Sequence, residues 1–179
     1  MNPSCNLFIV GPTGAGKTTI GRRLADHYGL SFVDLDQEIE RACGVPVSTV
    51  FEIEGEAGFR QRESALLAEC SARRGVVMAT GAGAVLDASN RRILAERGYV
   101  LWLQATLEQQ LERLAQDRQR PLLAGTDRAE RLTAMAQRRT PLYQEVADLA
   151  IPGAHETVHA ASERSILLID QCWQRQHAA

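Results

Sequence analysis

The sequence has little of what secreted, membrane-spanning and nucleic-acid-binding proteins usually need. Its four cysteines, Cys5, Cys43, Cys70 and Cys172, include no closely spaced pair, which argues against a zinc site and suits a reducing compartment. No stretch approaches 18 consecutive apolar residues, and no basic segment precedes an apolar run at the N-terminus. The net charge of −2 gives no basic surplus for nucleic acid. We therefore expect a soluble, cytoplasmic protein with neither nucleic-acid nor membrane partners.

Lysine is almost absent as well. Of the 20 basic residues, 19 are arginine, and the one lysine is Lys17. A compact ammonium group and a forked guanidinium are not interchangeable at a tight phosphate site. The position of this single lysine is therefore informative about function.

The chain of 179 residues fits one compact domain, 1–179, and is long enough to bury a core. Short apolar runs alternate with helical patterns along it. We expect strands at 7–10, 32–33, 76–79, 99–103 and 149–151. We expect helices at about 17–28, 37–43, 48–67 (one or two helices, broken near Gly55 or Gly58), 87–97, 107–114, from 127, and 157–174. This alternation predicts an α/β fold of three layers, with a five-stranded parallel sheet flanked by helices.

The strongest motif is Gly11-Pro12-Thr13-Gly14-Ala15-Gly16-Lys17-Thr18, which fits G-x-x-x-x-G-K-[ST] between a strand and a helix. Its backbone N–H groups and the helix N-terminus would cradle phosphate oxygens. We expect Lys17 to reach the β- and γ-phosphates and Thr18 to coordinate Mg²⁺. The predicted ATP-binding residues of this segment are Gly14, Ala15, Gly16, Lys17, Thr18 and Thr19.

Two carboxylates, Asp34 and Asp36, follow the second expected strand. In an extended stretch their side chains face the same side, which would place both near the phosphate site. One could act on Mg²⁺ through water, and the other could hold and deprotonate an acceptor hydroxyl. Alternatively, Asp36 simply caps the next helix. The residues alone leave both interpretations open.

Three arginines, Arg60, Arg120 and Arg139, are candidates for binding an anion or the transferring phosphoryl group. Any one arginine among 19 is by default a surface charge. Arg120 lies in an irregular segment at about 116–126, which suits a mobile lid that closes over ATP. The glycine-rich segment 81–83 is either a plain strand-to-helix connection or a backbone wall that lets a substrate approach.

In their order and spacing, these motifs resemble those of the shikimate kinase family, over residues 7–151. The matching segments are the P-loop, Asp34-Leu35-Asp36, Phe59-Arg60 with Glu63, Gly81-Ala82-Gly83, Arg120-Pro121-Leu122-Leu123 and Arg139-Thr140-Pro141-Leu142-Tyr143. The resemblance implies a nucleoside-monophosphate-kinase-like P-loop fold, a substrate-binding region at about 34–63 and a mobile lid. It implies transfer of the γ-phosphoryl group of ATP to the 3-hydroxyl of shikimate, in aromatic amino-acid biosynthesis, by a monomer that uses Mg²⁺.

The resemblance also implies a role for each matching residue. Asp36 would hold the shikimate hydroxyls and serve as the base, while Asp34 would join the magnesium shell through water. Arg120 would reach the phosphates from the lid, and Arg113 would flank the adenine. The implied catalytic residues are Lys17, Asp36 and Arg120. The implied substrate-binding residues are Asp36, Phe51 and Phe59 along the ring, Arg60 and Arg139 on the carboxylate, Glu63 behind the arginine, and Gly81, Ala82 and Gly83 by their backbone.

One position departs from the family pattern, which usually has three glycines where this chain has Gly81-Ala82-Gly83. If Ala82 needs a positive φ, the alanine costs about 1 kcal/mol. If φ is negative, the methyl group only narrows the pocket. The adenine-side segment 152–155 matches the family loosely.

Two other functions compete with this interpretation. Another small P-loop kinase, acting on gluconate or a nucleotide, would share the phosphate machinery, but Arg60 and Arg139 with Asp36 favour a hydroxylated carboxylic acid. A nucleotide-binding regulatory protein with lost kinase activity would be expected to lack some acceptor-side residues, and here they are present. A guanine-reading N-K-x-D is excluded because the only lysine is Lys17.

Overall fold

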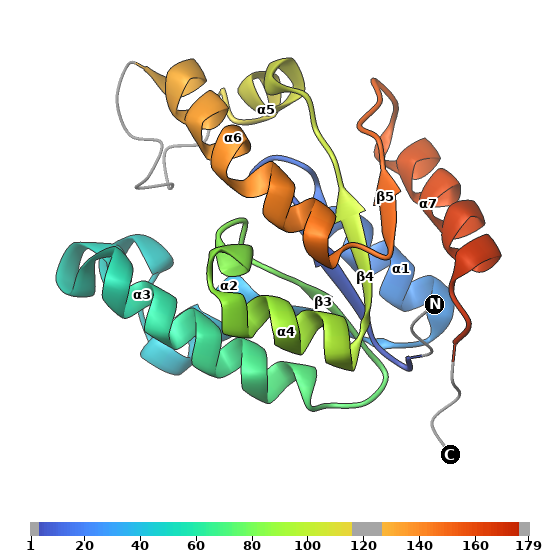
Figure 1. The fold of residues 1–179 in the computed structure, drawn as a ribbon, viewed down its shortest axis with the longest axis horizontal. Helices are drawn as coiled ribbons and strands as arrows, with labels where there is room; N and C mark the ends of the chain where they lie inside the picture. Colours follow the sequence, from blue (N-terminus) through green and yellow to red (C-terminus); the bar gives the residue numbers. More distant parts are fainter. Residues whose placement is uncertain (1–3, 116–126, 176–179) are drawn as a thin grey trace.

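The computed structural model describes residues 4–115 and 127–175, built around one sheet of five parallel strands (Figure 1). The strand order is β2-β3-β1-β4-β5, so β1 lies at the centre. The strands are β1 Leu7–Val10, β2 Ser31–Asp34, β3 Val76–Ala79, β4 Tyr99–Leu103 and β5 Leu149–Ile151. The expected parallel sheet is confirmed, and all five expected strands are present, with β2 longer at both ends than predicted.

Helices cover both faces of this sheet. They are α1 Lys17–Tyr28, α2 Leu35–Cys43, α3 Val47–Ser71, the short 3-10 helix η1 Ala84–Leu86, α4 Ala88–Arg97, α5 Leu107–Arg113, α6 Arg128–Val146 and α7 Val158–Cys172. Figure 1 shows α3, α4 and α6 in front of the sheet and α1 behind it. The expected three-layer architecture is therefore confirmed.

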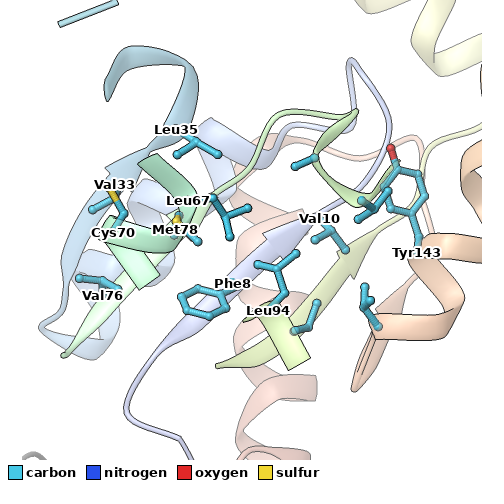
Figure 2. Packing of buried hydrophobic residues seen from close by; sticks show 14 residues of the cluster. Phe8, Val10, Val33, Leu35, Leu67, Cys70, Val76, Met78, Leu94 and Tyr143 are labelled. Atoms are coloured by element: carbon cyan, nitrogen blue, oxygen red, sulfur yellow. The ribbon is translucent and has the colours of Figure 1, made fainter. Parts of the chain in front are cut away.

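The alternating side chains of β1 explain these layers. Phe8 and Val10 enter a buried cluster with residues of α3, α4 and α6, which Figure 2 shows from close by. Leu7 and Ile9 point to the other face and pack with residues of α1 and α7. Because successive strand residues face opposite sides, the continuous apolar run of β1 supplies both cores. All four residues are fully buried.

Two predicted helix boundaries need comment. The break expected near Gly55 or Gly58 occurs at Gly55, whose φ of 68° and ψ of −176° interrupt α3. The start expected at residue 37 is wrong, because α2 already begins at Leu35. No helix among residues 4–115 and 127–175 is long and apolar enough to cross a membrane. The predicted lid, 116–126 with Arg120, lies outside the described residues.

Candidate active site

The loop between β1 and α1 has the backbone of a phosphate cradle. Gly11, Gly14 and Gly16 have positive φ values of 144°, 79° and 89°, which are strained for residues that carry a Cβ. A Cβ on Gly11 would also lie 2.2 Å from the carbonyl oxygen of Leu103. The N-cap of α1 is Gly16, which has no side chain to cap the first N–H groups of the helix. Lys17 Nζ donates to the carbonyl oxygens of the first two loop residues, each at 2.9 Å.

Asp34 joins this loop to the start of α2. Thr18 Oγ1 donates to Asp34 Oδ2 at 2.7 Å, while Asp34 Oδ1 accepts from the backbone N–H groups of Asp36 and Gln37 at 3.1 and 3.3 Å. Asp34 is therefore the N-cap of α2, so the alternative interpretation, in which Asp36 caps this helix, is wrong. The expectation of one extended stretch is wrong too, because the chain becomes helical at Leu35.

The oxygens of Thr18 and Asp34 suit Mg²⁺, which prefers hard oxygen ligands. No cluster of three or more acidic, histidine or cysteine side chains that could hold a metal ion occurs among the described residues. Mg²⁺ in kinase sites usually relies on one or two protein groups and completes its shell with water and substrate phosphates. A hydroxyl and a carboxylate meeting beside a phosphate loop therefore fit this ion.

Three helical side chains meet at the turn that follows β3. A Cβ on Gly81 would lie 2.2 Å from Glu63 Oε1 and 3.2 Å from Asp36 Oδ1, and one on Gly83 would lie 2.2 Å from Arg60 Nη2. Asp36 comes from α2, and the other two side chains come from α3. Glycine at 81 and 83 leaves the space that these side chains occupy.

Glu63 and Arg60 form the most buried ion pair of this region. Their atoms Oε2 and Nη1 lie 2.6 Å apart, with the Glu63 side chain fully buried and that of Arg60 21% exposed. Burial raises the pKa of Glu63, and the negative charge of Asp36 raises it further, while Arg60 opposes both. Buried atoms Glu63 Oε1 and Arg60 Nε have no hydrogen-bond partner.

An aromatic pair lies beside this ion pair. The guanidinium carbon of Arg60 is 5.1 Å from the ring centroid of Phe59, within cation–π range. The ring centroids of Phe51 and Phe59 are 4.4 Å apart. The two phenylalanines predicted to line the substrate ring thus pack against each other next to the predicted carboxylate ligand.

Arg139, the second arginine predicted to bind the substrate carboxylate, comes from α6. Its side chain is 8% exposed, and no carboxylate of the described residues forms an ion pair with it. Burial lowers the pKa of Arg139, and the charge of Arg60 lowers it further. It lines a cavity of about 340 Å³ together with Pro12 and Thr13 of the P-loop. A buried cation without a carboxylate partner suits an anionic ligand.

The predicted adenine side contains a second, smaller cavity. Arg113 Nη1 donates to the carbonyl oxygen of Gly14 at 2.9 Å, which ties α5 to the P-loop. Arg113 and the segment 152–154 line a cavity of about 40 Å³ beside Ala15. The structure thus brings Arg113 to the P-loop and to the segment that matches the family loosely, whereas Thr19 is exposed.

The backbone conformation of the turn 81–83 shows whether Ala82 is strained. No non-glycine residue of the described chain has a positive φ, so Ala82 carries no left-handed strain. Its carbonyl oxygen accepts a hydrogen bond of 2.5 Å from the hydroxyl of Tyr143. Sequence reasoning missed Tyr143 as a site residue. The only signal for it was its place in the segment Arg139-Thr140-Pro141-Leu142-Tyr143.

The model of one protein family, described as shikimate kinase, matches residues 13–169. The chain belongs to the shikimate kinase family. A shikimate kinase from Stenotrophomonas maltophilia (strain K279a) is 47% identical over 176 residues, 98% of each chain. One from Bordetella avium (strain 197N) is 57% identical over 145 residues, 81% of this chain and 69% of the relative.

Solved structures agree with this family. Shikimate kinase from Acinetobacter baumannii, in complex with shikimate, superposes with a TM-score of 0.91 at 42% identity, covering 94% of each chain. The family and this likeness make the chain an ATP-dependent kinase of the α/β P-loop type. Membership in the shikimate kinase family also separates it from the gluconate and nucleotide kinases considered from the sequence.

Proposed function

We propose that this protein transfers the γ-phosphoryl group of ATP to the 3-hydroxyl of shikimate, giving shikimate 3-phosphate and ADP. The observation that carries this proposal is the arrangement of Asp36 and Arg60 around the turn 81–83, with buried Arg139 lining a cavity beside the P-loop. A hydroxylated carboxylic acid needs cationic forks for its carboxylate and a carboxylate for its hydroxyl. Arg139 lines its cavity together with Pro12 and Thr13 of the P-loop, which supports a phosphate donor bound next to this acceptor.

On the phosphate side, the N–H groups of the P-loop and of the α1 N-terminus would bind the phosphate oxygens. Lys17 would exchange its two carbonyl partners for the β- and γ-phosphates. Thr18 and Asp34 would hold Mg²⁺, with Asp34 acting through water. Held there, Mg²⁺ would supply positive charge that offsets the negative charge of the phosphate oxygens.

On the acceptor side, Arg60 and Arg139 would hold the shikimate carboxylate while Glu63 orients Arg60 through their 2.6 Å contact. The Ala82 N–H would donate to the substrate. Asp36 would accept a hydrogen bond from the 3-hydroxyl and take its proton as the oxygen bonds to the γ-phosphorus. The bond between that phosphorus and the β,γ-bridging oxygen breaks, and ADP leaves with its electrons.

The remaining roles follow from the family likeness. Arg120, from the lid at 116–126, would stabilise the charge of the transferring group, and Arg113 would flank the adenine. We place the enzyme in the cytoplasm as a monomeric single domain. The four free cysteines support a reducing compartment.

The decisive measurement is ADP release from Mg·ATP with shikimate, gluconate or nucleoside monophosphates as acceptor. We expect strong stimulation by shikimate alone, with Lys17→Ala as the control that removes turnover. Stimulation by gluconate or a nucleotide instead would assign another acceptor. No stimulation by any acceptor, with ATP still bound, would indicate a regulatory protein that has lost its kinase activity.

A further inference from the structure

Tyr143 connects α6 to the turn 81–83 through its hydroxyl, which also hydrogen-bonds with the Arg139 side chain. Its side chain is 2% exposed, and its ring lies 5.9 Å from that of Trp102, centroid to centroid. Figure 2 shows the Tyr143 ring at the margin of the buried cluster, with its hydroxyl pointing away from the labelled apolar side chains. That hydroxyl donates to the carbonyl oxygen of Ala82, 61 positions away in the sequence. Apolar packing therefore fixes the ring, and the hydroxyl acts on the turn.

The hydrogen bond also sets the direction of a neighbouring N–H group. The Ala82 carbonyl and the Gly83 N–H belong to one planar trans peptide, in which they point in opposite directions. Because Tyr143 fixes the carbonyl, the Gly83 N–H points away from Tyr143. Gly83 itself lies against the Arg60 guanidinium, since a Cβ added to it would be 2.2 Å from Arg60 Nη2. Two backbone hydrogen bonds close the turn, from the Ala84 N–H to the Gly81 carbonyl and from the Leu86 N–H to the Gly83 carbonyl. Neither hydrogen bond uses the Gly83 N–H.

Tyr143 also lies beside the second arginine of the acceptor side. Arg139 precedes it by four residues on α6, so the two side chains share one face of the helix. Burial raises the pKa of Tyr143, although Arg139 opposes this shift. The hydroxyl therefore stays protonated at neutral pH and remains a donor.

We propose that Tyr143 is a positioning residue for the acceptor substrate. It acts through the peptide between Ala82 and Gly83, which it holds in the orientation that presents the Gly83 N–H beside Arg60, and it packs next to Arg139. This inference rests on the proposed function, because shikimate is the molecule that these groups receive.

The test is Tyr143→Phe, which removes the hydroxyl and keeps the ring. We expect the KM for shikimate to rise about tenfold, the upper range of one hydrogen bond's net contribution. The KM for ATP and kcat should stay within about twofold, because the Ala82 carbonyl that the hydroxyl contacts belongs to the acceptor-side turn. The matched control is Tyr99→Phe. Tyr99 is also 2% exposed, but it begins β4 at the opposite end of the strands from the turn 81–83, and its hydroxyl hydrogen-bonds with Cys172. Tyr99→Phe should leave both KM values unchanged.

The outcomes separate this inference from the proposed function. If the unaltered protein shows no shikimate-dependent ADP release, the proposed function fails. If it does turn over shikimate, an unchanged shikimate KM in Tyr143→Phe overturns the positioning role. So does an equal rise in both KM values, or the same rise in Tyr99→Phe.

A second measurement needs no variant and so does not depend on how the variants fold. Shikimate titrated into ¹⁵N-labelled protein should shift the Gly83 amide resonance, because this N–H is one of the positioned donors. A Gly83 amide that does not respond while the Arg60 and Arg139 side-chain signals move would contradict the inference.

Discussion

The two ends of the parallel strands differ in how their buried polar groups are satisfied. We call the end where the strands begin the amino edge and the end where they finish the carboxyl edge. At the amino edge, Asn6 precedes β1 and is 3% exposed. Its Nδ2 donates to the carbonyl oxygens of Ser71, Arg73 and Arg97 at 3.4, 2.8 and 3.3 Å, and its Oδ1 accepts from the Val76 N–H at 3.2 Å. One side chain thus joins the chain before β1 to α3, β3 and the end of α4. Every polar atom of this amide has a protein partner.

At the carboxyl edge, buried polar atoms are left without partners. Among the described residues five buried side-chain atoms have none. One belongs to Asn90 of α4 and one to Arg175, which forms a bridge with Ser4 near the amino edge. The other three belong to Arg60, Glu63 and Trp102. The first two surround the turn 81–83, and Trp102 lines the cavity that Arg139 also lines. An unpaired buried polar group costs about 1–3 kcal/mol. A ligand that supplies the missing partners would recover part of this cost, so this edge is organised for binding and the other for stability.

The largest expected effect is on substrate binding, from Arg139→Met at the carboxyl edge. We expect the KM for shikimate to rise about 10- to 100-fold, because hydrogen bonds to a charged group contribute about 1.5–3 kcal/mol. The free energy of unfolding should stay the same or rise, because the variant replaces a buried charge that has no carboxylate partner among the described residues. Steady-state kinetics and urea unfolding measure the two effects.

The control for this variant is Arg138→Met, at the neighbouring, exposed position of α6. It should change neither the KM for shikimate nor the stability. If Arg139→Met instead lost stability and kept its KM, Arg139 would be structural, and the contrast between the two edges would break.

Local motifs at the carboxyl edge could be predicted from the sequence, whereas the contacts between them could not. The P-loop is recognisable because its glycines, lysine and threonine act within eight consecutive residues between a strand and a helix. A break near Gly55 or Gly58 was predictable because glycine tolerates a positive φ, and the structure places it at Gly55. By contrast, Asp34 and Asp36 are both good N-caps, and only the folded chain shows that Asp34 caps α2.

The acceptor side depends on distant parts of the chain. Glu63 meets Asp36 because α2 and α3 converge on the turn after β3, and no periodicity in the sequence encodes that meeting. The contact from Tyr143 to Ala82 spans 61 positions and gives no local pattern. Composition and spacing therefore predicted the reaction class and the fold. The residues alone offered Asp36, Arg60 and Arg139 as candidates with alternatives left open, and the resemblance to a family was needed to assign their roles on the acceptor side.

The next effect is on stability, from Asn6→Ala at the amino edge. We expect the free energy of unfolding to fall by about 2 kcal/mol, because the Val76 N–H and three carbonyl groups lose their side-chain partner. The melting temperature should fall by about 4–8 °C for a chain of this length. The KM values for shikimate and ATP should not change. Gln144→Ala, at an exposed amide of α6, is the control, and a raised shikimate KM in Asn6→Ala would show that the two edges are coupled.

The smallest expected effect is the pH dependence that Glu63 gives to the carboxyl edge. Burial raises its pKa above the ordinary value of about 4.3, so the folded protein binds this proton more tightly than the unfolded chain. The corresponding stability is present below about pH 4.3 and is lost as the pH rises through the folded pKa. Glu63→Gln cannot titrate, so it should lack this loss.

Urea unfolding of both proteins between about pH 4 and 8 measures this difference. The free energy of unfolding of the wild-type protein, minus that of Glu63→Gln, should fall as the pH rises. Such a slope would mean that the buried Glu63 carboxylate lowers the free energy of unfolding at neutral pH. A side chain that orients Arg60 for a ligand is expected to carry this cost in stability. A difference that rises with pH would mean that the charge of Arg60 outweighs burial. The ion pair would then stabilise the fold, as Asn6 does at the opposite edge.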